Sequence, residues 1–117
     1  MNLDNAVEIH AQWKTKLRSA IVKREKLDHV CLSRDDCCEL GQWLHGDGRQ
    51  SYGRFASHAD CVVKHRAFHR EVAKVALAVN AGRYETAQEL LAPLSPFAQV
   101  SSSLSTALLR LKKETLS

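Results

Sequence analysis

The sequence predicts an all-α protein, a four-helix bundle with one additional short helix. Long stretches lack proline and glycine, and apolar residues recur in them every three or four positions. The chain has only 2 prolines and 5 glycines in 117 residues, too few for a turn-rich β-sandwich or barrel. Hydrophobic residues make up 44% of the chain, which fits a single domain over residues 1–117. No run of apolar residues approaches the roughly 18 that a membrane-spanning helix needs.

The first helix is predicted over residues 4–26, which contain neither proline nor glycine. Asp4 can cap its start, and Glu8 lies near the first turn, where the helix dipole favours an acidic side chain. Its apolar residues form one stripe: Ala6, Ile9, Trp13, Leu17, Ala20 and Ile21. Residues 27–34 lose this period, so they are predicted to form a connection.

A short second helix is predicted next. Ser33 or Asp35 can cap it, and it runs to about His45, where two glycines at positions 46 and 48 stop it. Residues 50–55 fit either a short helical turn or a loop. A long third helix follows over residues 57–80, and Gly82 supplies a left-handed residue after its end.

Two further helices complete the prediction. Residues 84–92 form one, which Pro93 and Pro96 terminate. Ser95 then caps the final helix, with Pro96 at its first position, and this helix reaches to about residue 113. Because its leucines exceed a single stripe, the last helix offers a surface for a second copy, although a small bundle can use a wide face internally: Leu104, Leu108, Leu109 and Leu111.

Charge and cysteine content narrow the function. Seventeen basic and 13 acidic residues give a net charge of +4, and the basic residues cluster over residues 14–26 and 110–113. No nucleic-acid-binding motif or aromatic interleaving accompanies them, so solvated helix faces are the preferred interpretation. The first residues lack a secretory signal, which predicts a reducing compartment. Four cysteines there indicate metal binding or redox chemistry rather than disulfides.

The strongest local signal is the pair His65 and His69 on the third helix. A spacing of four residues puts both imidazoles on one face, which can clamp a metal ion. Phe68 and Val72 share this face, so the pair is predicted to point toward the core. The alternative is two unrelated histidines, one in the core and one at its edge.

The four cysteines are not equally good candidates for metal ligands. Cys38 precedes Gly41 and Trp43 on the short helix, and its neighbour Cys37 cannot point the same way. Cys61 lies four residues before the histidine pair and is a rival ligand, but a buried free cysteine is common. Cys31 lies in a connection and has no predicted role.

The other histidines give weaker signals. His10 flanks the apolar stripe of the first helix, where a lone histidine is usually structural, unless the first and third helices are neighbours. His29, His45 and His58 lie in or near connections and are expected at the surface. Three imidazoles and one thiolate would suit Zn²⁺, which prefers four tetrahedral nitrogen and sulfur ligands. Four protein ligands would leave no position for a hydrolytic water, so no enzyme activity is expected.

The chain resembles the chemoreceptor zinc-binding (CZB) domain of bacterial signalling proteins. The resemblance rests on three motifs: His10 with Trp13, Cys38-Glu39-Leu40-Gly41-Gln42-Trp43, and His65-Arg66-Ala67-Phe68-His69. Their order and their separations agree with those of the family over residues 5–113. Weaker similarities support it: Asp35-Asp36, Ala81-Gly82-Arg83-Tyr84 and Pro96-Phe97-Ala98.

The resemblance implies that His10, Cys38, His65 and His69 bind Zn²⁺. It also implies a cytoplasmic, often homodimeric sensor domain that responds to zinc or to oxidation of the zinc-bound cysteine. Such domains are usually fused to chemoreceptors or to enzymes that make cyclic di-GMP, and residues 1–117 contain no such partner. The output is therefore expected from a separate signalling protein, or the chain is an excised fragment. A structural, zinc-stapled adapter is the alternative function, and Cys37 and Cys61 fall outside the ligand pattern.

Overall fold

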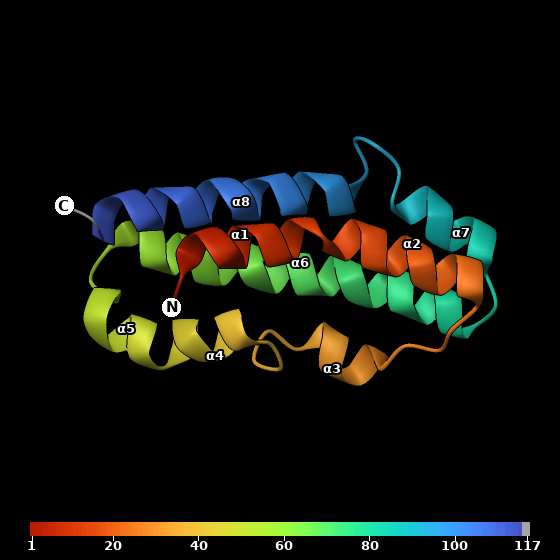
Figure 1. Cartoon of the computed structure of the whole chain (residues 1–117), viewed down its shortest axis with the longest axis horizontal. Coiled ribbons are helices and arrows are strands. Elements are labelled where there is room, and N and C mark those ends of the chain that lie inside the picture. Colours follow the sequence, from red (N-terminus) through yellow and green to blue (C-terminus); the bar gives the residue numbers. More distant parts are fainter. Residues whose placement is uncertain (116–117) are drawn as a thin grey trace.

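The computed structural model describes residues 1–115, which form eight helices and no strands (Figure 1). This confirms the predicted all-α fold. The helices are α1 (Leu3–Ala11), α2 (Trp13–Lys23), α3 (His29–Ser33), α4 (Glu39–His45), α5 (Asp47–Tyr52), α6 (Ala56–Asn80), α7 (Tyr84–Leu90) and α8 (Pro96–Thr115). Within the described part of the chain, no helix is both long and apolar enough to cross a membrane.

The helices form four rows around one core. α1 and α2 follow each other along one row, and α6 and α8 make two more. The fourth row is the chain of short helices α3, α4 and α5, each of which contacts α6 (Figure 1). The long α6 therefore contacts every other row, and any side chain on its inner face can meet residues from the rest of the bundle.

The core is aliphatic, as a chain with 6% aromatic residues requires. Phe68 and Val72 of α6 are fully buried, in line with the predicted inward face of that helix. Three of the four leucines that suggested a dimer surface are also fully buried within the protomer, and only Leu109 is exposed, at 50%. The wide apolar face of α8 is thus used mainly inside the bundle. The largest buried apolar side chains are Leu17, Leu44, Phe68, Val72, Val75, Leu91, Leu104, Leu108 and Leu111.

The predicted first helix is shorter than expected and is divided at Gln12. The amide of Gln12 donates to both the Glu8 and Ile9 carbonyl oxygens, so one tight turn separates α1 from α2 without a change of direction. α2 ends at Lys23 because Arg24 adopts a left-handed conformation, with φ 54°. Two hydrogen bonds of 2.7 Å between Leu27 and the Asn80 side chain then hold the following segment against the end of α6.

The predicted connection over residues 27–34 contains the five-residue helix α3. The Asp28 carboxylate caps it by accepting from the Cys31 amide at 3.2 Å, a capping signal that apolar periodicity does not reveal. α4 begins later than predicted, since its N-cap is Cys38 rather than Ser33 or Asp35. Later boundaries agree better: Gly82 has φ 74°, and the Ser95 hydroxyl caps α8 by accepting from the Ala98 amide at 3.2 Å.

Candidate metal centre

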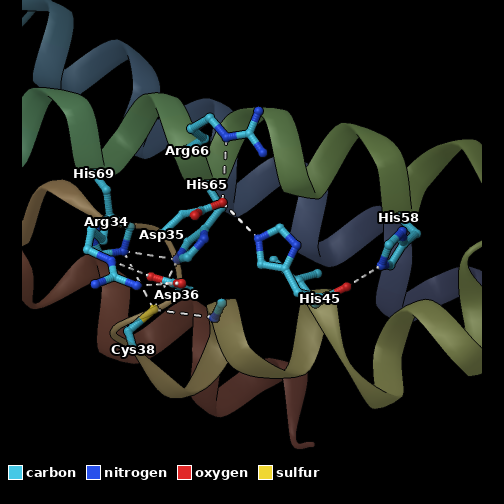
Figure 2. Close-up of polar contacts among 11 residues, drawn as sticks. Arg34, Asp35, Asp36, Cys38, His45, His58, His65, Arg66 and His69 are labelled. Atoms are coloured by element: carbon cyan, nitrogen blue, oxygen red, sulfur yellow. Dashed lines mark hydrogen bonds and ion pairs between the residues drawn. The ribbon is translucent and has the colours of Figure 1, made fainter. Parts of the chain in front are cut away.

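Four predicted side chains meet in the interior of the bundle. His10 comes from α1, Cys38 caps α4, and His65 and His69 lie one turn apart on α6. One potential ligand atom from each residue lies within 4.8 Å of all the others. All three histidines are buried and Cys38 is half-buried, so residues distant in sequence share one small space. Figure 2 shows Cys38 facing the two α6 imidazoles.

The distances within the cluster fit a tetrahedral ion. The Nε2 atoms of His65 and His69 are 3.0 Å apart, and the Cys38 sulfur lies 3.2 Å and 3.5 Å from them, respectively. Bonds of about 2.0 Å to nitrogen and 2.3 Å to sulfur around Zn²⁺ give tetrahedral edges of about 3.3 to 3.6 Å. These three donors therefore already approach the separations of zinc ligands.

The outer ring nitrogens fix how two imidazoles face the cluster. His10 Nδ1 donates to the Ala6 carbonyl oxygen at 2.9 Å, and His69 Nδ1 donates to the Leu32 carbonyl oxygen at 3.0 Å. Each Nε2 then presents a lone pair to the cluster, which is how metal-binding histidines are usually oriented. The buried Nε2 of His10 has no hydrogen-bond partner, and neither does the buried Nδ1 of His65. A cation would satisfy the unpartnered lone pair of His10.

The protonation states also suit a cation. Burial, followed by the neighbouring His69 and His10, lowers the pKa of His65 to about 3, and burial also lowers the pKa values of His10 and His69. The three rings are thus neutral at pH 7, with electron pairs free to bind. Burial raises the pKa of Cys38, against the opposing effect of amide hydrogen bonds from Gly41 and Leu40. Three neutral imidazoles and one thiol match the nitrogen and sulfur ligands that Zn²⁺ prefers.

Cys38 reaches the cluster because of its place at the start of α4. Its backbone is extended, with φ −106° and ψ 159°, and its sulfur accepts from the Gly41 amide at 3.3 Å. The side chain that caps the helix is thus also the sulfur that meets the histidines. The neighbouring Cys37 is exposed, as expected for adjacent cysteines that cannot point the same way.

An acidic residue lies beside the cluster. The Asp35 carboxylate accepts from His45 Nε2 at 2.9 Å and pairs with Arg66 Nε at 3.6 Å (Figure 2). Its charge also acts on His65 and His69, whose pKa values it raises slightly against the larger effect of burial. In the sequence, only the family resemblance relates Asp35 to the site. Asp35 lies in a turn, where no helical periodicity indicates which way its side chain points.

The remaining predicted residues lie outside the cluster. Cys61 is fully buried, and burial raises its pKa to about 12, but it does not join the four donors. The expectation that His58 lies at the surface is wrong: it is 3% exposed, and its Nε2 donates to the Leu44 carbonyl oxygen at 2.8 Å. His45, also expected at the surface, is half-buried against Asp35, and His29 is half-buried in α3. Both His45 and His58 are covered because residues 35–58 pack back against the bundle, and the sequence pattern does not reveal this packing.

Comparison with known protein families agrees with this site. Residues 10–76, more than half of the chain, match the model of the chemoreceptor zinc-binding domain, and the match spans all four clustered residues. Searches of curated proteins and of solved structures each gave no match. The family match and the chemistry of the donor cluster together identify Zn²⁺ as the cofactor. The chain belongs to the chemoreceptor zinc-binding domain family of signalling proteins.

Proposed function

We propose that the chain is a cytoplasmic sensory domain of bacterial signal transduction in which His10, Cys38, His65 and His69 hold the zinc ion. The observation that supports this most is the convergence of these donors from α1, α4 and α6, with His10 Nε2 buried and otherwise unpartnered. Ligands from three helices make metal occupancy a condition of how those helices pack. A change at the site therefore changes the bundle, which a sensor requires.

Each residue has a distinct task in this proposal. When bound, Zn²⁺ supplies a redox-inactive positive charge that keeps the Cys38 sulfur as a thiolate. His10 and His69 are held in their ligating orientation by the carbonyl oxygens of Ala6 and Leu32. Cys38 supplies the one anionic donor, and it belongs to a helix of only seven residues. The ligand most open to chemical change thus stands at the start of a short helix.

Oxidation of Cys38 is the proposed signal. Its sulfur attacks one oxygen of a peroxide, the O–O bond breaks, and hydroxide or alkoxide leaves. With hypochlorous acid the sulfur takes up chlorine and hydroxide leaves, and water then replaces chloride on the sulfur. The sulfur loses two electrons and becomes a sulfenic acid, which is a neutral and weaker ligand. Because the same sulfur accepts the Gly41 hydrogen bond, the loss of its negative charge weakens the N-cap of α4 in the same event. Release of α4 is the structural change that a partner would detect.

A small cavity beside Cys38 offers space for such an oxidant. It has a volume of about 80 Å³, and Ile9, His10, Trp13, Cys38 and Leu40 are among the residues that line it. A buried water needs a cavity of about 10–15 Å³, so this space can hold a molecule of the size of hydrogen peroxide. The predominantly apolar walls favour small uncharged species over ions.

The output in this proposal is a change of contact with another protein. The family implies association with a signalling protein, such as a chemoreceptor or a diguanylate cyclase, and often a second copy of the domain. Of the four leucines considered for such a homodimer, Leu109 is the exposed one. A zinc-stapled adapter that holds partners without sensing is the competing function.

Metal analysis of the purified protein tests the site. We expect about one zinc per chain in the wild type, and a large loss in Cys38→Ser and His69→Ala. The matched control is Cys37→Ser, measured under reducing conditions, which should retain full zinc because Cys37 is exposed and outside the cluster. Equal zinc in all four proteins would reject the ligand set.

A competition titration separates the sensor from the adapter. Sensing of zinc requires an affinity within the range of free zinc in the cell, so that occupancy changes. Sensing of oxidants requires that peroxide or hypochlorite release zinc from the wild type. A site that neither physiological zinc nor oxidant empties would support the adapter instead.

A further inference from the structure

The proposed zinc ligand His69 is oriented by a backbone atom from outside its own helix. Its Nδ1 donates at 3.0 Å to the carbonyl oxygen of Leu32, which belongs to the short helix α3. A hydrogen bond at Nδ1 fixes the tautomer and the ring plane, so that Nε2 presents its lone pair to the other ligands. His10 differs, because its Nδ1 donates to Ala6 within the same helix α1. The orientation of His69 therefore depends on where α3 lies, whereas that of His10 does not.

Helix α3 depends on outside contacts to hold its position. It has five residues, none of them fully buried, and an isolated helix needs roughly 12 or more to be even marginally stable in water. The residue before its N-cap is Leu27, whose amide donates to Asn80 Oδ1 at 2.7 Å. The carbonyl oxygen of Leu27 accepts from Asn80 Nδ2, also at 2.7 Å. One side-chain amide thus binds both backbone groups of Leu27 and fixes the place where the chain enters α3.

We propose that Asn80 is a positioning residue for the zinc centre: it holds Leu27, and thereby places α3 so that Leu32 can orient His69. The inference rests on the proposed ligand set and goes beyond it. Asn80 is the last residue of α6, about 16 Å further along that helix than His69 at 1.5 Å per residue. Among the contacts described, its side chain bonds to Leu27 and to none of the four ligands.

The short path from Leu27 to Leu32 can transmit this constraint. The Leu32 amide donates to the carbonyl oxygen of Asp28 at 3.0 Å, which closes one helical turn between the anchor and the carbonyl that binds His69. Both leucines are partly buried against the core, and α3 lies against α6 (Figure 1). Because this turn is hydrogen-bonded, a displacement of Leu27 moves the carbonyl oxygen of Leu32 with it.

Zinc competition titrations of the full chain provide the first test. Asn80→Leu keeps a similar size and removes both hydrogen bonds to Leu27. We expect zinc affinity to fall about tenfold, the low end of the effect of losing a contact that orients a metal-binding histidine. Asn80→Asp keeps an acceptor for the Leu27 amide and loses the donor, so it should lower the affinity less. This milder variant keeps the test available if Asn80→Leu does not fold.

The matched control is Ser57→Ala, at the opposite end of α6. Ser57 also makes a 2.7 Å side-chain hydrogen bond to another segment, in this case to the Glu114 carboxylate of α8. Its loss should lower the free energy of unfolding without changing zinc affinity, because Ser57 has no part in placing α3. This control separates loss of stability from loss of ligand orientation.

The ring protons provide a second test that a purely structural role would not pass. NMR of the zinc-loaded protein measures how fast the Nδ1 protons of His10 and His69 exchange with water. In Asn80→Leu we expect the His69 proton to exchange faster and the His10 proton to keep its wild-type rate, since its acceptor lies within α1. In Ser57→Ala both protons should keep their wild-type rates.

The outcomes separate this inference from the ligand set on which it rests. If the wild type binds zinc and both Asn80 variants keep its affinity and its His69 exchange rate, Asn80 has no positioning role. Equal acceleration at His10 and His69 would also overturn the inference, because it would show a general loosening of the bundle. Failure of the wild type to bind zinc would reject the ligand set itself, and metal analysis reports that result independently of the Asn80 variants.

Discussion

The backbone carbonyl oxygen of Asp35 lies directly against Gly41, in the space that a side chain at position 41 would need. A Cβ atom there would stand 1.5 Å from that oxygen and 3.1 Å from Cε1 of His65. The turn before Cys38 thus folds back onto the first turn of α4, and only the absence of a side chain permits the approach. The glycine of the Cys-x-x-Gly motif is explained by this contact.

Gly41→Ala should therefore disrupt the centre without replacing any of the four ligands. The backbone of residues 35–38 must move away from α4, which displaces Cys38 from His65 and His69. We expect a loss of about 1–3 kcal/mol in the free energy of unfolding and weaker zinc binding. Denaturant unfolding and a zinc competition titration measure the two effects. Gln42→Ala, at the next and exposed position, is the matched control and should leave both values unchanged.

Removal of zinc should lower the thermal stability. A ligand present at 100 times its dissociation constant stabilises the folded state by about 2.7 kcal/mol. For a domain of this size, that corresponds to a fall in Tm of about 10 °C when a chelator is added. Calorimetry or circular dichroism with and without chelator measures it. The Cys38→Ser variant should already melt at the lower temperature and respond little to chelator; a full chelator effect in that variant would exclude Cys38 as a ligand.

Local patterns predicted much of the fold and of the site. The spacing of His65 and His69 on an uninterrupted amphipathic stretch was enough to place both rings on one inner face. The burial of His58 and the pairing of His45 with Asp35 could not be predicted, because both depend on how residues 35–58 pack against α6. Periodicity describes each helix by itself, whereas these contacts depend on how a loop returns to the bundle.

The helix boundaries near Cys38 show the same limit. Serine and aspartate are the usual N-caps, so the sequence predicts Ser33 or Asp35 rather than a thiol at this position. The Cys38 sulfur takes this place because it also contacts the buried His65 and His69. These two residues lie 27 and 31 positions further along the sequence. At this helix start, the contact of Cys38 with the histidines outweighs the local preference for a serine or aspartate cap.

The charge of Asp35 should strengthen zinc binding. Asp35→Asn removes the carboxylate that binds His45 and Arg66 beside a site of net positive charge, so we expect a fall in zinc affinity of about tenfold. Asp36→Asn is the matched control, since Asp36 is exposed and pairs only with Arg34 among the contacts described. Competition titrations of both variants at pH 7 measure the difference, and equal affinities would show that the Asp35 charge plays no part.

The same carboxylate gives a pH dependence of known sign. Burial alone would raise the pKa of Asp35, but the hydrogen bond from His45 and the charges of His45 and Arg66 outweigh it and lower the pKa below 3.8. A lowered pKa stabilises the folded state at pH values above 3.8 and the benefit is lost as the pH falls through the folded-state value. The stability difference between wild type and Asp35→Asn, measured without zinc, should therefore shrink on acidification below pH 3.8.

Thiol labelling of the reduced protein should distinguish the cysteines by environment. Cys37 is exposed and should react with iodoacetamide in the presence or absence of chelator. Cys61 is fully buried and its pKa is raised to about 12, so it should stay unreactive in both conditions. Cys38 should change: metal binding occupies its sulfur, and chelation frees it beside a cavity of about 80 Å³. We therefore expect mass spectrometry of residues 35–49 to show one additional label after chelation, at Cys38. Equal labelling of Cys38 in both conditions would mean that zinc does not protect this sulfur, and the oxidation switch would then have no chemical basis.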